Sequence, residues 1–276
     1  MIKNINELHE IDLEILKEFL KICENNNLQY FMIGGTFLGA IRHQGFIPWD
    51  DDIDIAMPRE DYEKFLKFAP TLLPNYLKIN NFKTNPEYHY YITRIINTKF
   101  PTIEKRIGND GKNTFVSIDI FPIDGTPNQK IYKKIYYIRI LWHRALMSLC
   151  YRDSIDRDRK RKKTEQIVLS ILQRIPFEKF TSAIRQKNII DKLLKEQKIE
   201  TSDEIGTIMG AYRLTEIVPK RYFGKGKLYK FEDLELYGPE LSDEYLTHMY
   251  GNYMQIPPVS EQKIHFQFQE QEKRKE

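Results

Sequence analysis

The chain has 276 residues, of which 41% are hydrophobic and 30% charged, with a formal net charge of +4 and two cysteines. It contains no apolar run near the ~18 residues that a membrane-spanning helix needs, and its N-terminus lacks the apolar core and cleavage site of a secretory signal. Cys23 and Cys150 lie in apolar-periodic segments and are expected in the core, so a reducing, cytoplasmic setting is the simplest expectation.

Hydrophobic spacing predicts an amphipathic helix over residues 6–25, followed by alternating strands and short helices. Strands are expected near 29–34, 51–57, 76–82, 88–97 and 114–122, with helices over 36–42 and 59–69. Residues 128–198 are predicted to be almost wholly helical. The remainder returns to mixed structure, with an extended pair near 226–236 and a helix near 239–250. The alternation indicates an α/β (α+β) fold.

A glycine pair follows the first predicted strand. Gly34 and Gly35 are expected to form the turn that leaves the strand, with Thr36 as the N-cap of the next helix. Backbone N–H groups at such a turn and helix start attract phosphate. Arg42 lies on the same helix, and its planar guanidinium can grip a phosphate through two hydrogen bonds. Taken alone, this triplet is more often an ordinary strand-to-helix turn.

Four carboxylates crowd together shortly after this unit. Asp50, Asp51, Asp52 and Asp54 repel one another unless they are solvated or bridged by a cation, and Mg²⁺ takes one or two carboxylates plus substrate phosphates. On a strand, Asp52 and Asp54 point to one face while the intervening isoleucines enter the core. An isolated acidic run is usually a solvated loop. Beside the glycine turn, it favours a metal-assisted phosphate site, with Asp50 and Asp51 supporting the ligands or anchoring the loop.

The run GGTFLGAIRHQGFIPWDDDIDI, residues 34–55, resembles the signature of the LicD family of phosphocholine and related phosphoalcohol transferases. Similar blocks continue at residues 58–65, 116–125 and 245–258. The resemblance implies a nucleotidyltransferase-like mixed β-sheet core flanked by helices, with a mainly helical basic insertion. We accordingly expect a catalytic core over residues 1–127, the insertion over 128–205, and a mixed segment over 206–276 that completes the catalytic domain.

The resemblance also implies a third carboxylate on a neighbouring strand, and Asp119 is the matching candidate. Apolar residues alternate around it, as on a half-buried strand. Asp124 is the competing acid, but its place before a glycine favours a turn. Asp52, Asp54 and Asp119 are therefore the expected ligands of Mg²⁺, with Mn²⁺ as the alternative. Together with Arg42 they are the expected catalytic residues.

A CDP-alcohol donor follows from the resemblance. A metal on Asp52 and Asp54 would neutralise charge on the leaving nucleotide phosphate, while Asp119 completes the metal site or accepts a proton from the attacking hydroxyl. Phosphocholine would pass from CDP-choline to a cell-surface glycan precursor of the teichoic acid, capsule or lipopolysaccharide type, with release of CMP. Trp49 is the leading aromatic face for the quaternary ammonium, and His43 is expected to orient a phosphate or the acceptor.

Other functions stay open at this level. The alcohol could be ribitol or glycerol, an NTP could nucleotidylate a small molecule, or the fold could serve as a membrane-bound scaffold without turnover. The intact carboxylates argue against the last of these. Release of CMP from a donor would separate a scaffold from the enzymes.

The predicted insertion is basic, since residues 128–174 contain 13 Lys and Arg against 4 Asp and Glu, a net charge of +9. Within residues 131–150, cations alternate with aromatic and aliphatic side chains. Such a helix suits anionic lipid at the inner membrane face, where a lipid-linked glycan would be presented, or a phosphate-bearing acceptor. A core helix with a solvated basic face is an equal alternative. Nucleic acid is not an expected partner, because the basic excess is confined to this region. The cations expected to meet lipid are Lys133, Lys134, Arg139 and Arg144, with Trp142 at headgroup level.

Overall fold

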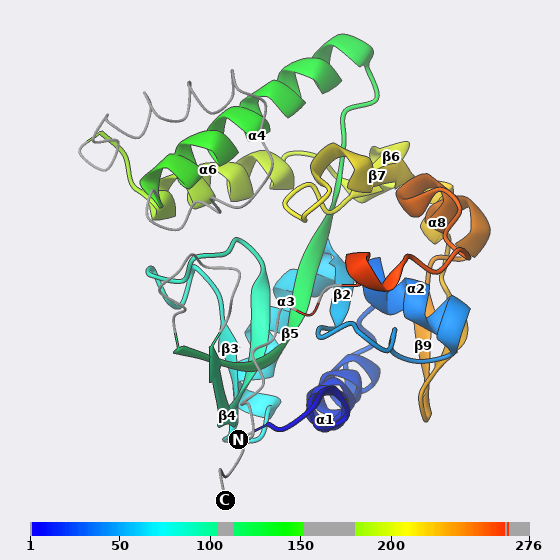
Figure 1. Cartoon of the computed structure of the whole chain (residues 1–276). Coiled ribbons are helices and arrows are strands. Elements are labelled where there is room, and N and C mark those ends of the chain that lie inside the picture. The colour runs from blue at the N-terminus through cyan, green and yellow to red at the C-terminus, as the bar shows by residue number, and fades with distance from the viewer. Residues whose placement is uncertain (1, 104–112, 152–179, 263, 265–276) are drawn as a thin grey trace, which may run out of the picture.

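The computed structural model describes residues 2–103, 113–151, 180–262 and 264 (Figure 1). It confirms the mixed α/β fold: a curled sheet carries helices on its faces, and two further helices lie side by side beyond one end of it (Figure 1). Within these ranges, no helix combines the length and the apolar composition that crossing a membrane would require.

The central sheet has the strand order β1-β2-β5-β4-β3. Its members are β1 (Phe31–Met32), β2 (Asp54–Pro58), β3 (Leu77–Asn80), β4 (Thr93–Ile103) and β5 (Asn113–Gly125). Strands β2 and β5 pair in parallel, whereas β1–β2, β3–β4 and β4–β5 are antiparallel. The far end of β5 extends the sheet to β6 (Glu204–Gly206), which pairs with β7 (Ile217–Pro219).

Three helices flank the sheet: α1 (Ile5–Asn25), α2 (Gly34–His43) and α3 (Arg59–Leu72). The first begins at Asn4, whose side chain accepts a hydrogen bond from the Glu7 N–H at 3.0 Å. One stripe of α1 is fully buried, including Ile15, Leu16 and Phe19. Burial of each such side chain contributes about 1.5–3 kcal/mol, so packing against the sheet stabilises this helix.

A second apolar cluster lies between the sheet and the helices α4 (Lys130–Cys150) and α6 (Ala183–Lys195). Tyr91 enters it from the sheet side and Ile140 and Ile190 from the helices. The chain then continues through η3 (Ile199–Thr201), η4 (Arg213–Glu216), α7 (Lys220–Phe223), the hairpin β8 (Lys227–Phe231) and β9 (Leu234–Gly238), α8 (Ser242–Tyr250) and η5 (Val259–Glu261).

Most expected elements are confirmed, and two strands start later than predicted. β2 begins at Asp54, so Asp52 precedes it. β4 begins at Thr93, because Tyr88 and Tyr91 leave the sheet and pack into the second apolar cluster. The helical prediction for residues 128–198 is confirmed at α4 and α6, while residues 152–179 lie outside the described part. The division of the chain at residues 127 and 205 stays a prediction.

Candidate functional site

Parallel pairing of β2 with β5 brings two predicted site residues together. Asp54 is the register partner of Asp119, and the Asp119 N–H donates to the carbonyl of Ile53 at 2.8 Å. Neighbouring strands lie about 4.8 Å apart, and side chains in register share a face of the sheet. Carboxylates far apart in the sequence therefore meet at one place on the sheet.

Asp119 is buried and carries an arginine partner that the sequence reasoning did not identify. Nε of Arg94 donates to Oδ1 of Asp119 at 2.7 Å, and the two residues face each other across β4 and β5. The guanidinium also lies 4.4 Å from the ring centroid of Tyr90. Arg94 thus orients Asp119 and supplies a positive charge beside it. The position of Arg94 within the apolar run of a predicted strand was the sequence signal that could have identified it as the partner of a buried acid.

The glycine pair begins helix α2, so the expected N-cap role of Thr36 is wrong. Gly34 has a φ of +58° and Ile33 is the N-cap residue, which places Thr36 in the first helical turn. There its Oγ1 accepts a hydrogen bond from the Asp54 N–H at 2.8 Å. The threonine ties the start of the helix to β2.

Close approach of two carboxylates explains why glycine is needed at this helix start. A Cβ on Gly34 would lie 2.8 Å from Oδ2 of Asp54, and one on Gly35 would collide with Oδ2 of Asp50. Negative charge is stabilised at a helix N-terminus by the helix dipole. The backbone expected to meet phosphate thus adjoins the acids expected to meet a cation.

The loop that carries Asp50, Asp51 and Asp52, called the acidic loop below, brings together a different group of carboxylates from the predicted ligands Asp52, Asp54 and Asp119. Oxygens of Asp50, Asp51 and Asp52 all lie within 4.8 Å of one another, and all three residues are half-buried. Asp52 is not on the strand with Asp54, which corrects that part of the prediction. His9 anchors the loop: its Nε2 lies 2.7 Å from the Asp50 carbonyl oxygen. Carboxylate oxygens at this spacing suit a hard divalent cation.

Three of the residues predicted to bind substrate, Arg42, His43 and Trp49, lie close together. Arg42 lies 6.0 Å from the ring centroid of Trp49, and the rings of His43 and Trp49 meet edge to face at 6.3 Å. Nη1 of Arg42 donates to the Tyr253 carbonyl at 3.0 Å. Desolvation lowers the pKa of Arg42, and the charge of Asp50 partly opposes this shift. Arg42 is therefore held beside the acidic loop by the C-terminal segment.

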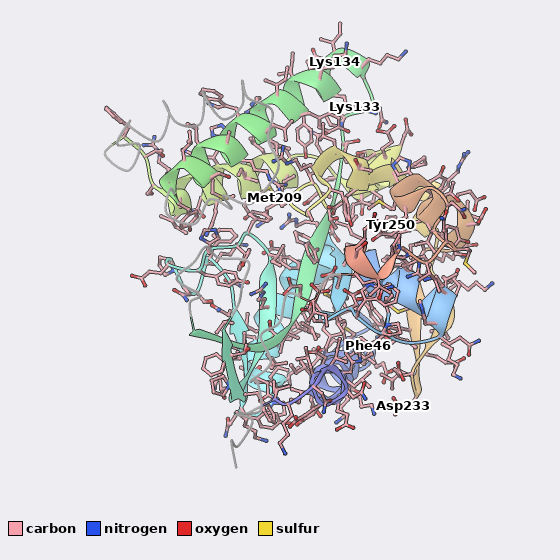
Figure 2. The ribbon with its side chains drawn as sticks, in the orientation of Figure 1. Phe46, Lys133, Lys134, Met209, Asp233 and Tyr250 are labelled. Carbon is pink, nitrogen blue, oxygen red and sulfur yellow. The ribbon has the colours of Figure 1, made fainter. Side chains whose placement is uncertain are left out.

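Three tyrosines from the C-terminal part are close enough to Asp54 to be affected by its charge, and sequence reasoning missed them as site residues. Tyr245 is buried, with its hydroxyl against the Gly34 backbone. The rings of Tyr212 and Tyr250 lie edge to face, with centroids 5.9 Å apart; Figure 2 labels Tyr250. Burial raises the pKa of Tyr250, and the charges of Asp54 and Asp50 add to that shift. Only folding brings these rings to the acids. Tyr245 and Tyr250 do lie in the block 245–258, which resembles the LicD family in sequence.

Asp124 is not a turn residue, which corrects the prediction. It lies in β5, is 1% exposed, and accepts two hydrogen bonds from Arg59, at 2.7 Å from Nε and 2.5 Å from Nη2. Arg59 also donates to Asp191 of α6 at 3.2 Å. The network joins α3, β5 and α6 and is structural.

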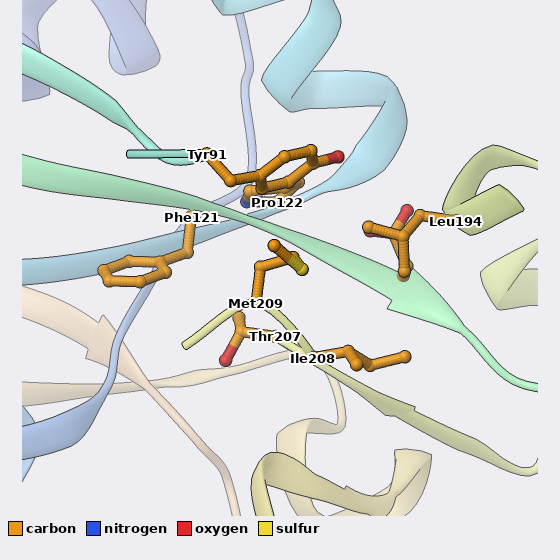
Figure 3. Close-up of a pocket in the computed structure, with 8 residues that line it drawn as sticks. Tyr91, Phe121, Pro122, Leu194, Thr207, Ile208 and Met209 are labelled. Carbon is orange, nitrogen blue, oxygen red and sulfur yellow. The ribbon is translucent and has the colours of Figure 1, made fainter. Parts of the chain in front are cut away.

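A small hollow lies beside this network, between β5, α6 and the segment before η4 (Figure 3). Phe121 reaches it from β5, on the same strand face as Asp119 by the period of two. Asp124 lines it, whereas Asp52, Asp54, Asp119 and Arg42 do not. The hollow is lined by Tyr91, Phe121, Pro122, Asp124, Leu194, Thr207, Ile208 and Met209.

Comparison with known proteins gives four likenesses. Residues 27–182 match the family model described as LicD/FKTN/FKRP, nucleotidyltransferase domain. The Haemophilus influenzae lipopolysaccharide cholinephosphotransferase LicD is 31% identical over 268 residues, which cover 95% of each chain. Human ribitol 5-phosphate transferase FKRP is 38% identical over 48 residues, 17% of this chain and 10% of its own. An uncharacterised Rickettsia typhi protein is 42% identical over 57 residues, 21% of this chain and 18% of its own.

Proposed function

This chain belongs to the LicD family, and from that membership and the geometry of the site we propose that it moves phosphocholine from CDP-choline to a hydroxyl of a cell-surface glycan precursor, releasing CMP. Family membership supports a phosphoalcohol transferase in general terms. The observation that carries the proposal is the meeting of Asp54 and Asp119 across β2 and β5, beside the acidic loop and the glycine start of α2. Teichoic acid, capsule and lipopolysaccharide precursors are the proposed acceptors.

The carboxylates of Asp50, Asp51 and Asp52 fit a divalent cation, Mg²⁺ or Mn²⁺, because their oxygens lie within 4.8 Å of one another. We assign Asp52, Asp54 and Asp119 to hold it. When bound, such a cation offsets the charge that builds on the leaving nucleotide phosphate. Asp50 and Asp51 are close enough to contribute to the same site.

The chain's own groups then position the donor and the acceptor. The N-terminus of α2, at Gly34 and Gly35, and the Arg42 guanidinium engage the diphosphate. The acceptor hydroxyl oxygen attacks the phosphorus that carries choline, and the bond from that phosphorus to CMP breaks. The hydroxyl proton passes to Asp119, oriented by Arg94, if Asp52 and Asp54 hold the cation without it.

Choline recognition requires aromatic faces, because a quaternary ammonium has no hydrogen-bond donor. Trp49, the residue expected for this role, has Arg42 over its ring and His43 at its edge. Tyr212 is 52% exposed and packs against Tyr250 beside Asp50 and Asp54. We therefore assign the ammonium to the Tyr212–Tyr250 pair and assign Trp49 to holding Arg42.

Ribitol phosphate is the second candidate cargo, because the ribitol 5-phosphate transferase FKRP shares similarity with this chain. A donor screen distinguishes the candidates: CMP release is measured from CDP-choline, CDP-ribitol and CDP-glycerol, each with Mg²⁺, with Mn²⁺ and with EDTA. We expect cation-dependent release from CDP-choline above the other donors. Preference for CDP-ribitol would show that the transferred alcohol is ribitol instead of choline, while the proposed mechanism would stand. Release from none of them, under any cation, would contradict the proposed function.

The outer face of α4 supports a place for the protein at a membrane surface. Two of the four cations expected to bind lipid contact the protein instead. Lys133 pairs with Glu204 at 2.8 Å, and Arg144 donates to the carbonyls of Ile208 and Gly210. Figure 2 labels Lys133 and Lys134 at the start of the helix. The helix nonetheless exposes a stripe of large apolar side chains: Ile131, Tyr132, Ile135, Ile138 and Trp142.

This exposed stripe lies on the side of α4 away from its buried residues Tyr136 and Ile140. Lys134 and Arg139 are exposed within the same helix, and residues 130–150 contain no Asp or Glu. An apolar face flanked by cations only, with aromatic rings among them, fits an anionic bilayer surface. We propose that α4 rests on the inner membrane face, where a lipid-linked glycan acceptor is presented.

A further inference from the structure

Helix α1 carries a carboxylate that the sequence analysis did not single out. Asp12 is 1% exposed, and neither of its carboxylate oxygens has a hydrogen-bond partner among the described residues. It lies between buried apolar residues of the same helix. A carboxylate placed there without a partner requires an explanation, because buried polar groups are almost always hydrogen-bonded or paired.

The same part of α1 is fastened to the acidic loop. His9 precedes Asp12 by about one helical turn, so the two side chains lie on one side of the helix. The His9 ring stacks on Phe46 with centroids 3.8 Å apart, and its Nε2 meets the Asp50 carbonyl (Figure 2 labels Phe46). This contact holds the surface of α1 that carries Asp12 against the loop that carries Asp50 to Asp52.

The charges that act on Asp12 come from the proposed cation site. Burial raises the pKa of Asp12 well above its ordinary value, and the charges of Asp52, Asp51 and Asp119 add to the shift in that order. The acidic loop and β5 thus face this carboxyl from two directions. A divalent cation within the cluster would offset part of the negative charge that acts on Asp12.

We propose that Asp12 is a positioning residue of the cation site, a buried carboxylate on α1 whose charge is compensated by the divalent cation that we assigned to Asp52, Asp54 and Asp119. This inference rests on the proposed function, because it takes the cation as given. Its consequence is that cation binding and the packing of α1 are coupled: an occupied site stabilises the helix, and loss of Asp12 weakens the site.

The first test measures thermal unfolding and Mn²⁺ or Mg²⁺ titration of the whole chain, as wild type and as Asp12→Asn. The amide has the shape of the acid and no charge. In EDTA we expect Asp12→Asn to unfold at the wild-type temperature or above it. With cation, its gain in Tm should be less than that of wild type, and its affinity should fall about 10-fold, as for other residues that support metal ligands. Glu10→Gln is the matched control, because it removes an exposed carboxylate from the same helix and should keep the full gain.

A second measurement needs no variant. Hydrogen exchange of the wild type, with EDTA and with Mg²⁺, should show slower exchange in peptides from α1 when the cation is present, and no comparable change in α6. Unchanged exchange in α1, or a full cation-induced gain in Tm for Asp12→Asn, would overturn the role of Asp12 while cation binding by the wild type stands. A wild type that binds neither cation would instead remove the metal from the proposed function, and this inference with it.

Discussion

Two carboxylate clusters lie along β5, and their negative charge is neutralised in different ways. Asp124, near the end of the strand, meets Arg59 in a two-bond ion pair. Asp191 of α6 joins this cluster and also receives Lys83 at 3.4 Å and Lys195 at 2.8 Å. Asp119, nearer the middle of the strand, has Arg94, but it lies beside an acidic loop whose carboxylates crowd within 4.8 Å of one another.

The difference separates a structural cluster from a ligand site. Buried charges are costly unless they are paired, and the Arg59 cluster contains its own cations, so it needs nothing further to hold α6 against the sheet. Around Asp51, Asp52 and Asp119 the acids reinforce one another's charge at Asp12. A cation from outside the chain is the natural complement of such a cluster. If the proposed cation binds, the two clusters on this strand differ in the source of their positive charge: the chain alone supplies it to one, and a bound cation adds to Arg94 in the other.

The largest effect is expected when the structural cluster is broken. Asp124→Asn removes the two-bond partner of the buried Arg59 guanidinium and leaves it only Asp191 and Glu63, and breaking a buried pair costs about 3–5 kcal/mol. Urea denaturation should show this as a lower free energy of unfolding. Asp233→Asn is the control, because it removes an exposed ion pair with Lys17 and should change stability little (Figure 2). A fully stable Asp124→Asn protein would remove the basis of the comparison.

Amides in the acidic cluster should have the opposite signature, with activity lost and the fold kept. Asp54→Asn and Asp52→Asn should each lower turnover at least ~10²-fold, because an amide cannot supply the charge that holds a cation. Asp119→Asn should behave similarly. CMP release and Tm are measured on the same samples. Near-normal cation-dependent release from any one variant would show that the assignment of that residue is wrong.

Substitution of Arg42 tests whether the site needs the planar shape of the guanidinium as well as its positive charge. Arg42→Lys keeps the charge but loses the planar fork that donates to the Tyr253 carbonyl and that we propose engages the donor diphosphate. We expect kcat/KM for the donor to fall about 10-fold in the lysine variant, and further in Arg42→Ala. If Arg42→Lys is fully active, a point charge suffices at this position.

The tyrosine pair tests which cargo the acidic site accepts. Tyr212→Ala removes an aromatic face beside Asp50 and Asp54, and a desolvated cation–π contact contributes about 1–2 kcal/mol. The KM for CDP-choline should rise about 5-fold or more, while that for CDP-ribitol should change little, since ribitol carries no ammonium. Equal losses for both donors would assign Tyr212 to the nucleotide or to packing instead.

The smallest effect concerns the outer face of α4, on the side of the molecule that carries the structural cluster. Lys134→Glu should weaken co-sedimentation with anionic vesicles at low salt, since each lysine near such a surface contributes about 1 kcal/mol. Ile138→Ser should weaken binding to the same vesicles without changing the charge. Lys133→Glu is a poor variant for this purpose, because Lys133 pairs with Glu204. Binding that ignores lipid charge and both substitutions would contradict the membrane proposal.

Much of the fold could be predicted because its signals are local. Helical spacing identified α1 and α8, and alternation identified β5, since each pattern depends on neighbours a few residues away. The start of β4 was misplaced because Tyr88 and Tyr91 have the composition of a strand but pack into the cluster beneath α4 and α6. Asp124 was misassigned because the Asp-Gly pair is typical of turns, and the ion pair with Arg59 that keeps it in β5 is remote in sequence.

From sequence alone came the family resemblance, the glycine pair between a strand and a helix, and the crowding of acids in one loop, because each is written in consecutive residues. Tertiary structure alone decided which charges meet. The register of β2 on β5 placed Asp54 beside Asp119, and α1 brought Asp12 to the acidic loop. Segments remote in the sequence supplied Arg94 and Tyr212. Contacts of this kind depend on strand register and helix packing, which short-range periodicity does not encode.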